Sequence, residues 1–213
     1  MNDSAAPTGA GSTRSAAPAA ATSPGPGRRL RADAQRNVDA LLDAAKTAFA
    51  DSGVDAPAKQ IADLAGVGVG TLYRHFPKRS DLIVAVFQRE VDACAAAAPE
   101  LAAAHPIEVA IEKWLERYTE YLATKRGLAA ALHSGDPAYD ELPGYFLQRL
   151  GPALESLLEP ARAAGQIRRD ISAQDLLYAV ALLCIPVPGE GVEYSSRMVN
   201  LLVDGLRCGA QSA

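Results

Sequence analysis

The chain has 213 residues, of which 49% are hydrophobic and 22% charged, and its formal net charge is −4. This length allows one large domain or two modest ones with a substantial core, and the composition is that of a soluble globular protein. A net charge this small excludes a protein that binds polyanions through its bulk charge.

The cysteines and the apolar runs bear on the cellular compartment. Cys94, Cys184 and Cys208 are far apart and form no CxxC pair, which argues against a disulfide framework or a zinc site and for a reducing cytosol. No run approaches the roughly 18 apolar residues that a membrane helix needs, and the N-terminus does not have the pattern of a secretory signal. We therefore expect a cytoplasmic protein without a membrane partner.

The charge is unevenly distributed along the chain. Residues 28–81 contain nine Lys or Arg against seven Asp or Glu, whereas residues 82–213 contain eleven against seventeen. A basic segment beside an acidic body is expected when one domain binds nucleic acid and the other does not.

Residues 1–30 are predicted to form a disordered N-terminal tail. Ala, Pro, Ser, Thr and Gly dominate this segment, which has too few bulky apolar side chains to offset the entropy cost of ordering. Arg28, Arg29 and Arg31 lie at its end. They belong either to a solvated linker or to a basic arm that lies along DNA, and the sequence favours neither.

The first firm helix is predicted from about Asp33 to Ser52, because apolar residues recur along it at steps of three and four. Gly53 ends this helix, and Arg36 near its start could contact a phosphate. The apolar stripe consists of Val38, Leu41, Leu42, Ala45 and Phe49.

A helix-turn-helix unit is predicted directly after this helix. Ile61 and Leu64 form the apolar face of a first short helix, which Gly66 ends because glycine enters the left-handed conformation without steric cost. A second short helix directs Leu72 and Phe76 inward. Two short helices joined by a tight glycine turn can place the second helix in a DNA major groove.

The outward side chains of the second short helix suit DNA, because they offer hydroxyl, phenol, guanidinium and imidazole groups. Val69 and Arg74 are candidates for base contact, although Arg74 could instead contact a phosphate. Tyr73 could also merely pack in the core. Lys78 lies at the start of the next helix, where the helix dipole favours a phosphate. The DNA-binding candidates are Arg36, Lys59, Val69, Thr71, Tyr73, Arg74, His75 and Lys78.

The segment around this helix-turn-helix unit contains a specific series of residues. It contains Ile61-Ala62, Ala65-Gly66-Val67 and Gly70-Thr71-Leu72-Tyr73-Arg74-His75-Phe76, followed by Lys78 and Leu82. Over residues 35–91 this pattern resembles the DNA-binding domain of the TetR family of bacterial transcriptional regulators. Elsewhere the chain resembles that family only in its helical architecture. Two departures are Asp55-Ala56-Pro57, where the family often has a Ser or Thr cap, and Gly68, where it often has a phosphate-binding Ser.

The rest of the chain is also predicted to be all-α, because no period-two strand pattern competes. Pro152 and Pro160 lie within one helix and are expected to kink or break it. Ser172 and Asp175 are expected to cap another. The predicted helices span residues 81–94, 106–122, 127–132, 142–164, 172–184 and 192–206.

The resemblance implies a domain organisation and partners. A three-helix helix-turn-helix DNA-binding domain would occupy residues 31–80, and an all-helical effector-binding and dimerisation domain residues 81–213. The protein would bind double-stranded operator DNA as a homodimer and be released by a small-molecule effector. The dimer would form through residues 176–184 and 199–206, unless their apolar faces fill the intrachain core.

An effector pocket is expected among the aromatic side chains of the body, since such pockets combine apolar surface with a few hydrogen-bonding groups. Each of these side chains is also explained by ordinary core packing. The candidates are Trp114, Tyr118, Tyr121, Phe146, Leu150 and Tyr178.

An enzyme is the competing interpretation. His133, Ser134 and Asp136 have the residue types of a hydrolase triad, but they are neighbours in one loop without a Gly-x-Ser-x-Gly turn. The 3 histidines have no metal-binding spacing, so neither a metal nor another cofactor is expected. A protein–protein helical module is a third possibility. The sequence favours a transcriptional regulator, with repression as the expected direction.

Overall fold

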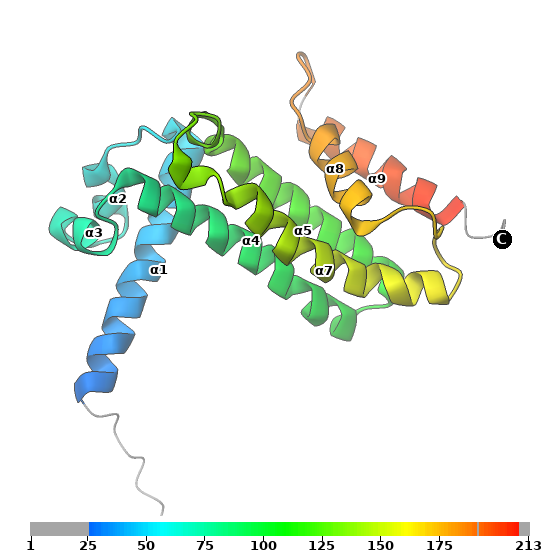
Figure 1. Ribbon diagram of the computed structural model, residues 1–213, viewed down its shortest axis with the longest axis horizontal. Helices are drawn as coiled ribbons and strands as arrows, with labels where there is room; N and C mark the ends of the chain where they lie inside the picture. Colours follow the sequence, from blue (N-terminus) through cyan, green and yellow to red (C-terminus); the bar gives the residue numbers. More distant parts are fainter. Residues whose placement is uncertain (1–25, 191, 209–213) are drawn as a thin grey trace, which may run out of the picture.

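The computed structural model describes residues 26–190 and 192–208, and all regular structure within these ranges is helical. The all-α prediction is therefore confirmed for this part of the chain. Figure 1 shows α1 to α3 at one end of an elongated molecule, α4, α5 and α7 in the middle, and α8 with α9 toward the other end. The elements are α1 (Pro26–Ser52), α2 (Ala58–Leu64), α3 (Val69–His75), α4 (Arg79–Ala104), α5 (Ile107–Gly127), α6 (Ala129–Leu132), the 3-10 helix η1 (Pro137–Tyr139), α7 (Leu142–Ala163), α8 (Ala173–Leu183) and α9 (Val192–Cys208).

The first helix begins earlier than its apolar stripe predicts. α1 starts at Pro26, so the expectation of a disordered tail is wrong for residues 26–30. Proline suits an opening helical turn, because an N–H group there has no helical partner. Arg28, Arg29 and Arg31 consequently lie within a helix, and whether this basic segment contacts DNA stays a prediction. The rest of the predicted tail, residues 1–25, lies outside the described residues.

The predicted glycine turn joins α2 to α3. Gly66 has a φ of 68°. Its N–H donates to the Asp63 carbonyl (3.2 Å), and the Val67 N–H donates to the Ala62 carbonyl (3.0 Å). These two bonds form a Schellman motif, which satisfies carbonyls that the end of α2 would otherwise leave without partners.

Buried side chains hold α1, α2 and α3 together. Leu72 and Phe76 are buried, as the sequence predicts. The inward orientation expected for Leu64 is wrong, because this side chain is 57% exposed. At about 100° per helical residue, Leu64 lies roughly 110° from the mean direction of Ile61 and Ala62, which are the residues that α2 buries.

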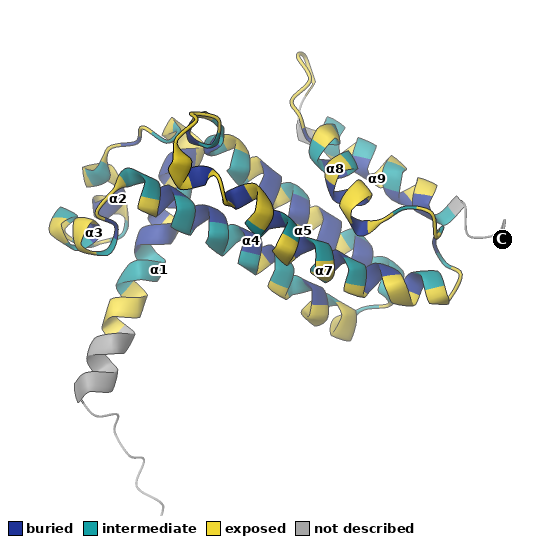
Figure 2. Ribbon diagram, in the orientation of Figure 1, coloured by how far each residue is buried: buried dark blue, intermediate teal, exposed yellow. Residues whose placement is uncertain are grey.

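The central bundle connects the helix-turn-helix end to the rest of the molecule. α4 extends from that end alongside α5 and α7, and buried positions recur along all three helices (Figure 2). Trp114 on α5 donates through Nε1 to the Cys94 carbonyl on α4 (3.0 Å). Tyr145 on α7 donates through its hydroxyl to Asp92 on α4 (2.8 Å). Both bonds fix the register of the neighbouring helices against α4.

Two helices continue through internal prolines. α7 runs unbroken through Pro152 and Pro160, so the predicted break is wrong. The carbonyls that these prolines leave without helical partners belong to Gln148 and Ser156, which are exposed, so that water can bind there. α4 passes Pro99 in the same way and extends beyond its predicted end, because its alanine-rich second half favours the helical state.

The last two helices close the fold. Ser172 caps α8 as predicted: its Oγ accepts from the Asp175 N–H (3.1 Å), and the Asp175 carboxylate accepts from the Ser172 N–H (3.1 Å). α9 packs against α5 and α8. Within the described ranges, no helix is both long and apolar enough to cross a membrane.

Candidate DNA-binding surface and effector cavity

Arg79 fixes the helix-turn-helix unit to the start of α4. Its Nε donates to the Val54 carbonyl (2.8 Å), and its second guanidinium nitrogen donates to the Ala56 carbonyl (2.6 Å). The guanidinium carbon also lies 4.9 Å from the centre of the Phe49 ring. Arg79 thus ties the segment between α1 and α2 to α4. This role could not be predicted from the sequence, because the carbonyls involved lie more than 20 residues away in the chain.

The outer face of α3 projects from the protein. Tyr73 is 52% exposed, and Arg74 is exposed beside it, whereas Thr71 and His75 are half-buried. Val69 is also half-buried and packs against the core. Leu72 anchors the opposite face of α3, so this short helix presents its polar side chains outward.

The cations around α3 differ in their partners. Lys59 pairs with Asp63 (2.7 Å), and Arg36 pairs with Asp33, whereas Arg74 and Lys78 form no ion pair among the described residues. The Asp81 carboxylate accepts from the Lys78 N–H (2.9 Å) at the N-terminus of α4. A phosphate near Lys78 would therefore share this helix start with a carboxylate, and the predicted phosphate contact of Lys78 stays a prediction.

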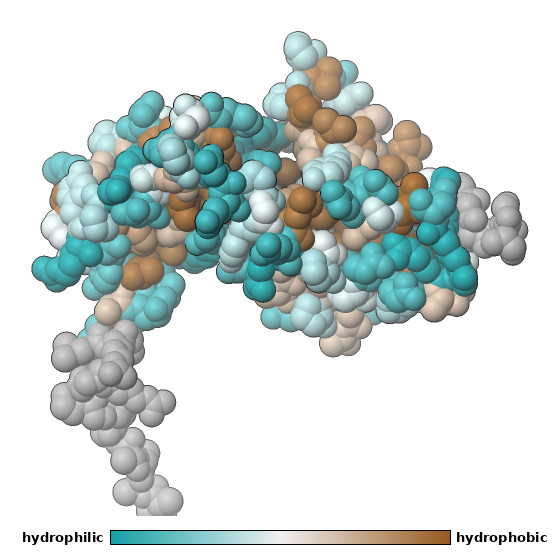
Figure 3. Space-filling view, in the orientation of Figure 1, coloured by the Kyte–Doolittle hydropathy of each residue, from teal (hydrophilic) through white to brown (hydrophobic). Residues whose placement is uncertain are grey.

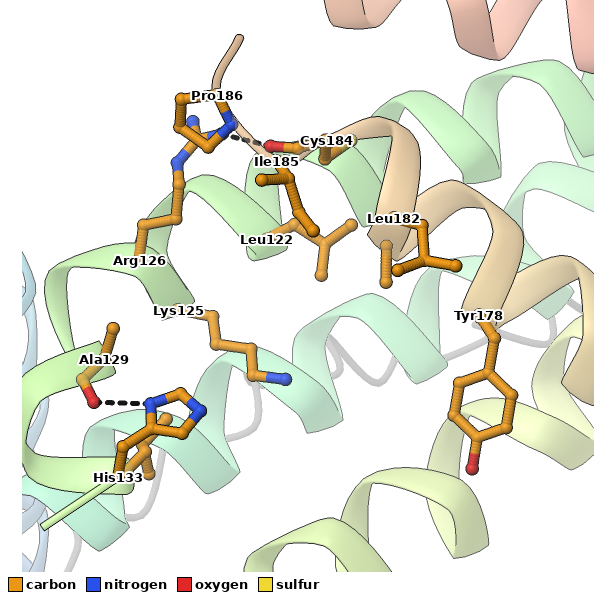
Figure 4. A pocket seen from close by; sticks show the side chains of 12 residues that line it. Leu122, Lys125, Arg126, Ala129, His133, Tyr178, Leu182, Cys184, Ile185 and Pro186 are labelled. Carbon is orange, nitrogen blue, oxygen red and sulfur yellow. Dashed lines mark hydrogen bonds between the residues drawn. The ribbon is translucent and has the colours of Figure 1, made fainter.

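Two adjoining chambers lie between α5 and α8, and together we call them the α5–α8 cavity. The larger chamber has a volume of about 610 Å³ and extends to Cys184 and Ile185 after α8. The smaller has a volume of about 300 Å³ and reaches Phe87 on α4. Lys125 and Tyr178 line both chambers. Figure 4 shows the Lys125 side chain extending into the open space between these helices.

The structure separates the predicted pocket residues into two groups. Tyr118, Phe146 and Tyr178 line the smaller chamber. The other three candidates, Trp114, Tyr121 and Leu150, are buried and line neither chamber. Burial raises the pKa of both the Tyr118 and the Tyr121 phenol.

The α5–α8 cavity contains a lysine that the sequence analysis missed. The Lys125 ammonium lies 5.7 Å from the centre of the Phe146 ring, and burial lowers the pKa of this lysine. Lys125 stands seven residues after Tyr118, which places both side chains on one face of α5. That helical spacing is a signal that could have identified it.

The proposed hydrolase residues do not assemble into a triad. His133 bonds through Nδ1 to the Ala129 carbonyl (2.8 Å), and the Ser134 hydroxyl accepts from the Asp136 backbone N–H (3.2 Å). Neither contact can activate a serine nucleophile. Among the described residues, no group of three or more His, Cys, Asp or Glu side chains could hold a metal ion.

Two families of known proteins match this chain, each over a different part of it. Residues 41–86 match the family described as bacterial regulatory proteins, tetR family, and residues 106–208 match the family described as transcriptional regulator SbtR-like, C-terminal domain. A solved TetR transcriptional regulator from Streptomyces coelicolor is 37% identical, with a TM-score of 0.66 over 80% of this chain and 98% of that one. The chain belongs to the TetR family of transcriptional regulators.

Other transcriptional regulators are also similar to this chain. A TetR transcription regulatory protein from Mycobacterium vanbaalenii is 34% identical, with a TM-score of 0.65 over 84% of this chain and 99% of that one. An HTH-type transcriptional regulator of Staphylococcus aureus strain USA300 is 41% identical over 64 residues. That match spans 30% of this chain and about a third (35%) of the curated relative. Members of the TetR family are generally transcription factors and not enzymes.

Proposed function

We propose that this TetR-family regulator is a homodimeric repressor that binds a near-palindromic operator and is released by a small molecule in the α5–α8 cavity. The observation that carries the proposal is the outer face of α3, where Tyr73 and Arg74 are exposed and Arg74 forms no ion pair among the described residues. Two such helices would enter successive major grooves about 34 Å apart.

The side chains divide into two roles. Arg36, Lys59, Thr71, Tyr73, His75 and Lys78 would contact the DNA backbone, which sets position and orientation. Arg74 would contact base edges, because a guanidinium can donate two parallel bonds to guanine. Val69 would add an apolar contact to a base, limited by its half-buried position.

Exposed apolar side chains on the last helices support a homodimer. Leu182 on α8 is 67% exposed and Leu201 on α9 is 65% exposed. Figure 3 shows hydrophobic surface over this part of the molecule. Exposed apolar surface of this kind favours an interface, because its exposure to water is unfavourable. Leu201 lines neither chamber of the α5–α8 cavity, and replacing it by Glu should give a monomer in sedimentation experiments.

Release by an effector requires that the ligand bind the two states of the dimer with different affinity. The walls of the α5–α8 cavity include residues of α4 and α5, and both of these helices contact α1 at the DNA-binding end. Phe87 belongs to α4, which begins at the helix-turn-helix unit. Lys125 lies two residues before Gly127, whose Cα approaches the backbone of α1 at Phe49. A ligand that moves either wall would alter the spacing of the two α3 helices.

Selection from a library of random duplexes tests DNA recognition. The enriched sequence should be an inverted repeat with half-sites about 10 base pairs apart. In fluorescence anisotropy, Arg74→Ala should weaken binding by about 1–3 kcal/mol and relax the preference at one position. The control is Arg117→Ala, which removes an exposed arginine of the body. Failure to enrich any sequence, or unchanged binding in both Arg74→Ala and Tyr73→Ala, would refute the proposal.

A further inference from the structure

We infer that the α5–α8 cavity takes an apolar carboxylic acid, whose carboxylate pairs with the Lys125 ammonium. This inference rests on the proposed function, because it names the chemical class of the effector. It follows from three properties of the cavity: its excess of positive charge, the environment of Lys125, and the apolar character of the remaining walls.

The walls of the larger chamber carry positive charge without a counter-charge. Lys125 and Arg126 line this chamber, and no Asp or Glu does. Neither cation takes part in an ion pair among the described residues. Arg126 donates to the Cys184 carbonyl (2.8 Å), which holds its guanidinium at the rim. Lys125 is therefore the cation available to a ligand inside.

The surroundings of Lys125 favour an anion. Its ammonium lies near the Phe146 ring (5.7 Å from the ring centre), and the residue as a whole is half-buried. Burial removes water from the charge and lowers the pKa. A carboxylate at hydrogen-bonding distance would replace the lost solvation and stabilise the charged form. The lysine is thus a preformed site for a negative group.

The remaining surface defines the rest of the ligand. Leu122, Leu132, Ala181, Leu182 and Ile185 line the larger chamber, and its volume of about 610 Å³ lies within the range of pockets for small molecules. One available lysine balances a single negative charge, so a monocarboxylate fits better than a phosphate ester with two. The ligand is accordingly an acid with an aliphatic or aromatic body.

Calorimetric titration with matched pairs of acids and alcohols tests this assignment. The aliphatic probes are octanoate and octanol, and the aromatic probes are naphthoate and naphthalenemethanol, all at neutral pH. At least one acid should bind the full-length protein about tenfold to a hundredfold more tightly than its alcohol, as expected for a charge-assisted hydrogen bond. Lys125→Met should remove this preference, and Lys125→Arg should retain it. The control Lys113→Met, at an exposed lysine of the same helix, should behave as wild type.

The outcomes separate this inference from the proposed function. Acids that bind no more tightly than their alcohols, or a preference that survives Lys125→Met, would overturn the inference. Specific DNA binding in the same preparations would leave the proposed function standing in either case. Conversely, an acid that binds through Lys125 without weakening operator binding would support the site and refute release by this ligand.

Discussion

Replacing Gly127 by alanine would place a methyl group against the backbone of α1. A Cβ atom at this position would lie 2.7 Å from the Phe49 carbonyl oxygen and 3.4 Å from the Ala50 Cα. The Phe49 oxygen cannot easily withdraw, because it accepts the Gly53 N–H (3.0 Å) at the end of α1. The substitution must therefore push α5 and α1 apart.

The expected cost combines two opposing effects. Overpacking against a fixed neighbour typically costs about 1–3 kcal/mol, whereas Gly→Ala in a helix contributes up to about 1 kcal/mol of stability. Gly127 is the last residue of α5, where the helical gain is small. The free energy of unfolding should consequently fall by about 1–2 kcal/mol.

Gly151→Ala is the matched control. Gly151 lies inside α7, and apart from its chain neighbours a Cβ there would meet nothing within 4 Å. Because Pro152 follows and disfavours the helical conformation of an alanine, the helical gain is offset, and this change should leave the free energy of unfolding within about 0.5 kcal/mol of wild type. Both variants can be compared by urea unfolding, followed by circular dichroism and by the fluorescence of Trp114. Equal stability of the two variants would refute the close approach of α5 to α1.

Three further predictions concern a pair of buried tyrosines, the glycine turn and a buried cysteine. The buried Tyr121 hydroxyl has no hydrogen-bond partner among the described residues, whereas Tyr118 donates to a backbone carbonyl. Tyr121→Phe should therefore leave the free energy of unfolding unchanged or raise it, and Tyr118→Phe should lower it by about 1 kcal/mol in urea titrations. Gly66→Ala should lower it by about 1–2 kcal/mol, because a Cβ disfavours the left-handed conformation. Burial raises the pKa of Cys94 to about 12, so its thiol is protonated at mildly alkaline pH. In a Cys184→Ser, Cys208→Ser background, labelling of Cys94 by a thiol reagent at that pH should require urea, and rapid labelling of the folded protein would contradict this.

The helix-turn-helix unit could be predicted because its determinants are local. The turn at Gly66 ends α2 through a bond from Gly66 to the residue three positions earlier and a bond from Val67 to the residue five positions earlier. The inward positions Leu72 and Phe76 follow from helical spacing alone. Leu64 shows the limit of this reasoning. In a helix of 7 residues, a side chain at the flank of the apolar face is buried only if a neighbouring element covers it.

The α5–α8 cavity depends on contacts that are distant in sequence. Whether an aromatic side chain of α5 lines a cavity or fills the core is decided by the positions of α7 and α8. Tyr118 and Tyr121 stand three residues apart with stacked rings (6.0 Å between centres), yet only Tyr118 lines a chamber. The spacing of Lys125 from Tyr118 is local information, but its significance depends on the absence of carboxylates from walls supplied by other helices.

The contact at Gly127 would, on the proposed function, link the α5–α8 cavity to the end of the molecule that carries α3. Binding free energies are linked reciprocally, so saturating operator duplex should weaken the binding of naphthoate or octanoate by the same factor by which the acid weakens operator binding. If the α5–α1 contact carries this coupling, Gly127→Ala should change the factor, and Gly151→Ala should leave it as in wild type. An unchanged factor in Gly127→Ala would exclude that contact as the route. The coupling would then run through Phe87 and α4, which is the other wall of the cavity that leads to the DNA-binding end.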